Sequence, residues 1–173
     1  MEEIEVPTEH LHETIEEKVE ESIKENSHNW SMYVAISTAL IAVFAAISAL
    51  MAGDHADEAL IAQIKASDNW AYYQAKGIKA EIALLGTATG KTTQADHDKY
   101  KSEQEDIKKE ATAYQDESEA HLVRHAKLAR AVTLFQIAIA IAAIAILTRK
   151  KFLWYGSMAL ALIGVWFFAL GIM

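Results

Sequence analysis

Three stretches of the chain carry no charged side chain, and the charged residues are gathered before and between them. The uncharged stretches cover residues 30–53, 131–147 and 152–173. A helix needs roughly 20 apolar residues to cross about 30 Å of hydrocarbon, and the second stretch reaches that length once Thr148 and the flanking arginines are included. A helix in a soluble core rarely lacks a polar face. The pattern therefore predicts three transmembrane helices, at residues 30–53, 131–148 and 152–173.

The long segment between the first two spans, residues 54–130, is predicted to form an antiparallel helical hairpin outside the membrane. The run GTATGKTT at 86–93 has the composition of a turn. Thr93 followed by Asp96 resembles a capping box and marks the start of a second helix.

An apolar seam at heptad spacing then continues from this second helix into the second span without a change of phase. This continuity predicts one helix from about residue 94 to residue 148, in a coiled-coil-like stalk. The seam comprises Tyr100, Ile107, Ala111, Tyr114, Ser118, His121, His125, Leu128, Val132 and Phe135.

Small residues follow one face of the first span at alternating spacings of four and three, and they are expected to let helices approach closely in lipid. They are Ala35, Ala39, Ala42, Ala46, Ala49, Gly53 and Ala56. A related stripe continues beyond the membrane through Leu60, Ile64, Ser67, Ala71, Gln74, Ile78, Ile82 and Leu85. If Gly53 lies level with Ala131 in the hairpin, Trp70 is expected near Tyr114 and Leu85 near Lys99.

The amino-terminal segment, residues 1–29, is acidic. An apolar stripe with a spacing of four (Leu11, Ile15, Val19 and Ile23) predicts an amphipathic helix that Thr8 can cap. A helix on a membrane surface favours basic residues on its polar face, whereas this one has glutamates. We expect it to pack on a protein partner or on a second copy of the chain, with partial disorder as the alternative.

The basic residues predict an orientation. Arg149, Lys150 and Lys151 form a short basic link between the second and third spans, and short basic loops stay in the cytoplasm. The amino terminus is then cytoplasmic and the hairpin lies outside. Basic residues at 124–130 oppose this orientation, although long loops carry little weight in the rule. The first span begins too far along the chain, and lacks a basic leader, for a cleaved signal peptide.

Charge and composition exclude several classes of function. The net charge of −8 is unsuited to binding nucleic acid, and the absence of cysteine removes thiol catalysis and thiolate metal sites. No acid or base lies inside a span, which argues against ion-coupled transport. The turn at 86–92 has only three residues between its glycines and follows a helix, so a nucleotide-binding P-loop is not expected. No hydrolase constellation is evident, and we expect no enzyme activity and no cofactor.

One group of side chains has the types and spacing of metal ligands. Glu117, His121 and His125 stand four residues apart on one helix face, and His55 and Glu58 lie opposite in the expected register. Imidazole and carboxylate at such spacings suit divalent ions. The sequence favours an ordinary polar seam here, so we assign no metal site, with metal binding or pH-sensitive packing as alternatives.

The segment SDNWAYYQAKGIK at residues 67–79 is the most distinctive in the chain. Together with EAHLVRH at 119–125 and TLFQ at 133–136, it resembles a bacterial family of small inner-membrane proteins known only as a domain of unknown function. The resemblance implies a bacterial inner-membrane location and the three-span layout, and it implies no activity.

Aromatic and hydrogen-bonding side chains surround most of two turns in this segment, which is typical of a protein interface. The candidate interface residues are Asp68, Trp70, Tyr72, Tyr73, Gln74 and Lys76. We therefore expect a non-enzymatic homo-oligomeric scaffold that assembles through its stalk. The alternatives are a small oligomeric channel lined by Ser37, Thr38 and Gln136, or a metal- or pH-sensing membrane protein.

Overall fold

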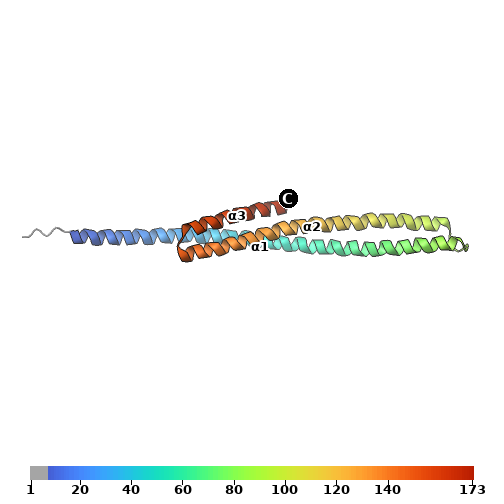
Figure 1. Cartoon of the computed structure of the whole chain (residues 1–173), viewed down its shortest axis with the longest axis horizontal. Helices are drawn as coiled ribbons and strands as arrows, with labels where there is room; N and C mark the ends of the chain where they lie inside the picture. The colour runs from blue at the N-terminus through green and yellow to red at the C-terminus, as the bar shows by residue number, and fades with distance from the viewer. Residues whose placement is uncertain (1–7) are drawn as a thin grey trace, which may run out of the picture.

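The computed structural model describes the backbone of residues 8–173 and the side chains of residues 29–173. It contains three α-helices: α1 (Thr8–Thr87), α2 (Gln94–Thr148) and α3 (Lys151–Ile172) (Figure 1). No strand occurs in this part of the chain. Each of the three helices is long and apolar enough to cross a membrane, which is the character of a membrane protein.

The longest helix joins three segments that the sequence presents as different in character. α1 has 80 residues and includes the acidic amino-terminal segment from Thr8, the first apolar span and the charged arm that follows it. At about 1.5 Å per residue it is about 120 Å long. The apolar stripe from Leu11 to Ile23 lies outside the described side chains, so its packing stays a prediction.

The second helix confirms the local signals in the sequence. α2 begins at Gln94 and ends at Thr148, and Thr93 and Asp96 form the expected capping box. The preceding link is a turn closed by a hydrogen bond of 3.0 Å from the Lys91 amide to the Gly86 carbonyl. Gly90 takes a positive φ of 68°, a conformation that glycine adopts without strain.

α1 and α2 lie side by side and run in opposite directions (Figure 1). The Ser118 hydroxyl donates to the Ala59 carbonyl at 2.9 Å, and the Gln104 amide donates to the Tyr73 carbonyl at 3.2 Å. These contacts differ from the expected register by one heptad, because Gly53 level with Ala131 would place Ala59 opposite His125. The expected pairs Trp70 with Tyr114 and Leu85 with Lys99 are therefore wrong.

The error has a simple cause. Sliding one helix along the other by seven residues leaves every seam position facing the seam, so heptad spacing alone cannot choose between the two registers. The turn between α1 and α2 determines which of the two registers forms. The Thr92 hydroxyl donates to the Ala83 carbonyl at 2.5 Å, and its side chain packs on Gly86 in the last turn of α1.

α1 meets α2 through a different face from the strip of small residues that stands out in the sequence. The expected strip of small residues between Ala35 and Gly53 is exposed along the span. The buried positions are instead Val34, Ile41, Ala45, Ser48 and Ala52 in the span, followed by Ala59, Ala62, Ala66, Ala80 and Ala83 in the stalk. Alanines on this face let the two helices pack closely. On α2 the expected seam is correct: its members are buried or half-buried.

α3 folds back along α2 and has a smaller contact with α1, where the Phe168 ring meets the Phe44 ring with centroids 6.1 Å apart (Figure 1). The contact between α3 and α2 is tight. The Ser157 hydroxyl of α3 donates to the Ala138 carbonyl of α2 at 2.7 Å, and the buried Phe135 ring lies against Gly164. One polar contact joins α3 to α1: the Trp154 indole N–H donates to the Ser37 hydroxyl at 3.1 Å. The apolar core of the three helices is centred on Phe135.

The three apolar segments end at nearly the same level in this register. Gly171 of α3 lies against Leu128 of α2, and the Ala52 carbonyl of α1 contacts His125 of α2 at 2.8 Å. The hairpin beyond this level is charged. His55 of α1 and His121 of α2 are therefore among the first polar side chains beyond the apolar segments.

Candidate functional site

The candidate interface segment, residues 68–76, divides between two environments. Trp70, Tyr73 and Lys76 are half-buried, and the first two stack edge to face with ring centroids 5.5 Å apart. Asp68, Tyr72 and Gln74 are exposed. Part of the segment therefore helps to join α1 to α2 within one chain, while the rest faces outward.

Lys76 is the centre of the contacts within the chain. Its ammonium group forms an ion pair with Glu103 of α2 and lies 5.2 Å from the Tyr72 ring centroid and 5.5 Å from the Tyr100 ring centroid. The hydrogen bond to Glu103, followed by the one to Tyr72, raises the pKa of Lys76. The same bond with Lys76 lowers the pKa of Glu103. This pairing could not be predicted from the sequence alone, because it depends on the register of the two helices.

A bulky apolar stripe remains exposed on the outer face of α1. Leu60, Ile64, Ile78, Ile82 and Leu85 are between 53% and 73% exposed. They follow the stripe expected from the sequence, on the side of α1 away from the buried alanines. Exposed apolar surface of this extent is typical of a site that contacts another molecule.

This stripe continues the exposed small residues of the span on the same face. At 3.6 residues per turn, the exposed positions from Ala35 through Gly53 to Leu85 stay in phase. Their spacings are three and four except for one gap of seven, where Ala56 of the expected strip is half-buried. We call the combined surface the outer stripe of α1. It consists of Ala35, Ala39, Ala42, Ala46, Ala49, Gly53, Leu60, Ile64, Ser67, Ala71, Gln74, Ile78, Ile82 and Leu85.

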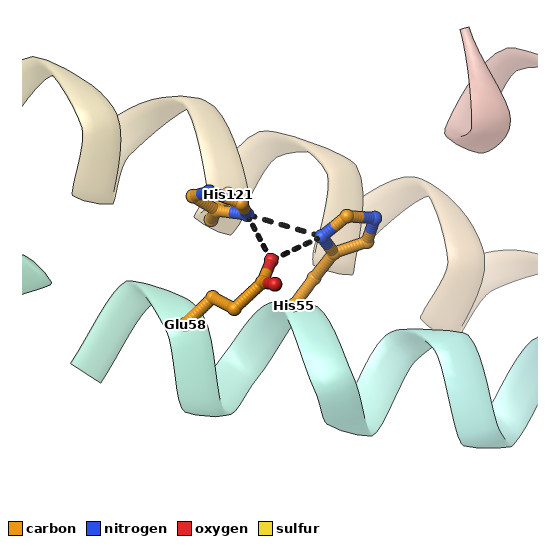
Figure 2. Close-up of side chains that lie close together, drawn as sticks. All are labelled: His55, Glu58 and His121. Carbon is orange, nitrogen blue, oxygen red and sulfur yellow. Dashed lines mark hydrogen bonds and ion pairs between the residues drawn. The ribbon is translucent and has the colours of Figure 1, made fainter. Parts of the chain in front are cut away.

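A second feature lies where the apolar segments end. His55 and Glu58, three residues apart on α1, face His121 of α2 (Figure 2). The two imidazole Nδ1 atoms are 3.1 Å apart. Glu58 Oε2 lies 2.9 Å from His121 Nδ1 and 3.4 Å from His55 Nδ1. We call these three residues the His–Glu cluster.

The structure selects three of the five candidate ligands. The ligand atoms of His55, Glu58 and His121 lie within 4.8 Å of one another, a spacing at which one metal ion could contact all three. His125 Nδ1 instead lies 2.8 Å from the Ala52 carbonyl oxygen, and Glu117 is exposed. The sequence identified all five residues, but only the observed register shows which of them meet.

Comparison with known families places the chain in one of them. The family described as "Domain of unknown function (DUF4337)" matches residues 30–173. The chain belongs to this family. No curated protein and no solved structure matches the chain. The DUF4337 match confirms the expected uncharacterised family. The matched residues include the whole outer stripe and the His–Glu cluster.

Proposed function

We propose that this DUF4337 protein is a non-enzymatic scaffold of the bacterial inner membrane that assembles with copies of itself. In this proposal α1, α2 and α3 each cross the bilayer once, and the hairpin between the first two spans forms a stalk outside it. The observation that supports self-assembly is the outer stripe of α1, which stays exposed on a single face from the span to the tip of the stalk.

The two parts of the stripe suit two environments. In lipid, helices associate through small residues that let their backbones approach, and the span portion contains only alanine and glycine. In water, bulky aliphatic residues at heptad spacing drive association, and the stalk portion has leucine and isoleucine. One partner helix of the same kind, parallel to α1, satisfies both requirements.

A second copy of this chain is the partner that fits best. Copies inserted in one bilayer share the same orientation and depth, so a two-fold axis along the membrane normal places each stripe residue beside its own counterpart. Small residues then face small residues in the span, and bulky ones face bulky ones in the stalk. Of the expected interface residues, Gln74 lies on the stripe and Asp68 lies beside it, while Tyr72 is exposed next to Lys76.

The basic link at Arg149–Lys151 supports an orientation with the amino terminus in the cytoplasm and the stalk outside. The acidic amino-terminal part of α1 is then available to a cytoplasmic protein partner. Chemistry on a bound substrate has no part in this proposal.

Disulfide crosslinking in native membranes tests the interface directly, because the chain contains no cysteine of its own. Single cysteines at Ile64→Cys, Ile78→Cys and Leu85→Cys should each form covalent dimers on oxidation, since each residue faces its counterpart. Lys109→Cys is the matched control. Lys109 is highly exposed on α2 and pairs only locally, with Asp106 three residues earlier on the same helix, so it has no part in the proposed interface. Equal crosslinking at Lys109 and at the stripe positions, or none at any stripe position, would refute the proposal.

Disruption of the stripe gives an independent test. Ile78→Glu with Ile82→Glu introduces like charges into the proposed interface and should reduce the mass of detergent-purified protein in light scattering to that of one chain. Leu122→Glu changes an equally apolar residue on α2 that is 53% exposed, and it should leave the mass unchanged. An unaltered mass in the double variant would contradict the assembly.

A further inference from the structure

The geometry points to a binding site for one divalent transition-metal ion of the zinc type at the His–Glu cluster, with Nδ1 of His55, Nδ1 of His121 and Oε2 of Glu58 as ligands. This inference does not depend on the proposed self-assembly, because all three ligands come from a single chain.

The separations of the three atoms already approach those of a metal centre. In a tetrahedral zinc site with bonds of about 2.0–2.1 Å, neighbouring ligand atoms are about 3.3 Å apart. Here the three separations are 3.1, 2.9 and 3.4 Å. An ion placed over this triangle would contact all three atoms after small side-chain adjustments, with the fourth position open to water.

The chemistry of the three atoms also favours a cation. A carboxylate oxygen only accepts hydrogen bonds, and a neutral imidazole carries a proton on one nitrogen alone. Two Nδ1–H groups facing each other across 3.1 Å would repel, so at most one of the two Nδ1 atoms carries a proton. The other Nδ1 then has its lone pair beside a carboxylate oxygen. A metal ion at the centre relieves this convergence by accepting all three lone pairs.

Burial and charge support the same conclusion. The side chains of His55 and His121 are 18% and 16% exposed, so the packed helices hold the rings in place. The Glu58 side chain is 56% exposed, which gives an ion a route from solvent. Asp54 and Asp57 are exposed on the same helix and add negative charge nearby. Two nitrogens and one oxygen suit zinc-type ions, whereas calcium and magnesium require oxygen ligands.

The position of the site gives the ion a structural effect. Two ligands belong to α1 and one to α2, so binding would join the two helices just beyond the apolar segments (Figure 2). Because only the paired helices bring the ligands together, the ion stabilises the folded hairpin by mass action.

Cobalt binding tests the site. The full chain is purified in detergent without a polyhistidine tag, treated with chelator, and titrated with Co²⁺, whose tetrahedral complexes absorb visible light strongly. His10, His12 and His28 are replaced by alanine in every sample, so that they cannot contribute. We expect one equivalent of Co²⁺, displaced by Zn²⁺, and a thermal midpoint that rises when Zn²⁺ is added.

Variants then assign the ligands. His55→Ala and His121→Ala should each weaken Co²⁺ binding by roughly tenfold or more. Removal of a residue that only hydrogen-bonds a metal ligand often costs that much, and these two residues are direct ligands in the proposed site. Glu58→Gln should weaken it similarly, and its exposed, isosteric side chain leaves the helix pair folded, as circular dichroism will verify. His97→Ala is the control, because His97 pairs with Asp98 near the tip of the stalk. Absence of Co²⁺ binding, or equal binding in the His121→Ala and His97→Ala proteins, would overturn the inference.

Discussion

Phe135 of α2 and Gly164 of α3 are in such close contact that a Cβ atom on Gly164 would lie 2.8 Å from the Phe135 ring. The ring is fully buried and also meets Phe44 of α1, with centroids 6.2 Å apart. The missing side chain at Gly164 is therefore what lets α3 pack against the ring that joins all three helices.

Adding a methyl group at this point should destabilise the bundle. In Gly164→Ala the ring cannot withdraw without disturbing Phe44, and overpacking of this kind costs typically about 1–3 kcal/mol. We expect a lower thermal midpoint in detergent. Gly156→Ala is the matched control on the same helix, because a Cβ there meets nothing within 4 Å. Equal midpoints for the two variants would show that α3 does not pack on Phe135 in this way.

The Lys76–Glu103 pair predicts how the stalk responds to pH. The folded-state pKa of Glu103 lies below its ordinary value of 4.5, so the unfolded chain binds this proton more readily. The contribution of the pair is thus present above pH 4.5 and is lost as the pH falls through the lowered pKa. The pKa of Lys76 is raised above 10.5, so its contribution is lost only as the pH rises beyond that value.

Hydrogen exchange of the amides near Lys76 and Glu103 can measure this dependence. We expect protection to fall as the pH is lowered through the acidic range, after correction for the intrinsic exchange rates. Glu103→Gln should exchange faster than the wild type at pH 7 and should lose most of the acid dependence. Because Lys109 and Asp106 form an exposed pair within one helix, Asp106→Asn should change little. An unchanged acid response in Glu103→Gln would assign the dependence to other groups.

The start of α2 offers a test of the turn. The Thr93 backbone amide donates to Asp96 Oδ2 at 3.0 Å, and the Asp96 amide donates to the Thr93 hydroxyl at 3.3 Å. Thr93→Ala removes the second of these bonds and also the bond that the Thr93 hydroxyl donates to Asp96 Oδ2 at 2.7 Å. Loss of such a cap costs about 0.5–2 kcal/mol. Faster hydrogen exchange is expected in the first turn of α2, while exchange near Phe135 stays unchanged. Thr89→Ala, which removes a hydroxyl in the preceding turn, is the comparison.

Features that depend on neighbouring residues could be predicted from the sequence. The three apolar segments, the turn at 86–93, the capping box at Thr93 and the heptad seam of α2 each follow from composition or spacing within one segment. The structure agrees with these features because helix formation and membrane burial are decided by local composition.

Features that depend on the match between two helices could not be predicted in the same way. A heptad seam is unchanged by a shift of seven residues, so the sequence placed His55 and Glu58 opposite Glu117, His121 and His125 without showing which of the three they meet. α1 also has two faces of suitable residues, and the sequence does not say which one meets α2. The Lys76–Glu103 pair was missed for the same reason.

The register itself can be measured with paired cysteines, since the chain has none to remove. Ser118 Oγ lies 2.9 Å from the Ala59 carbonyl oxygen, so Ala59→Cys with Ser118→Cys should form a disulfide within one chain. Ala59→Cys with His125→Cys, which corresponds to the register shifted by one heptad, should stay reduced under the same oxidation. Mass spectrometry of the digested protein distinguishes the two. A disulfide in the second pair alone would restore the register expected from the sequence and would separate His121 from His55, so this measurement also bears on the metal site.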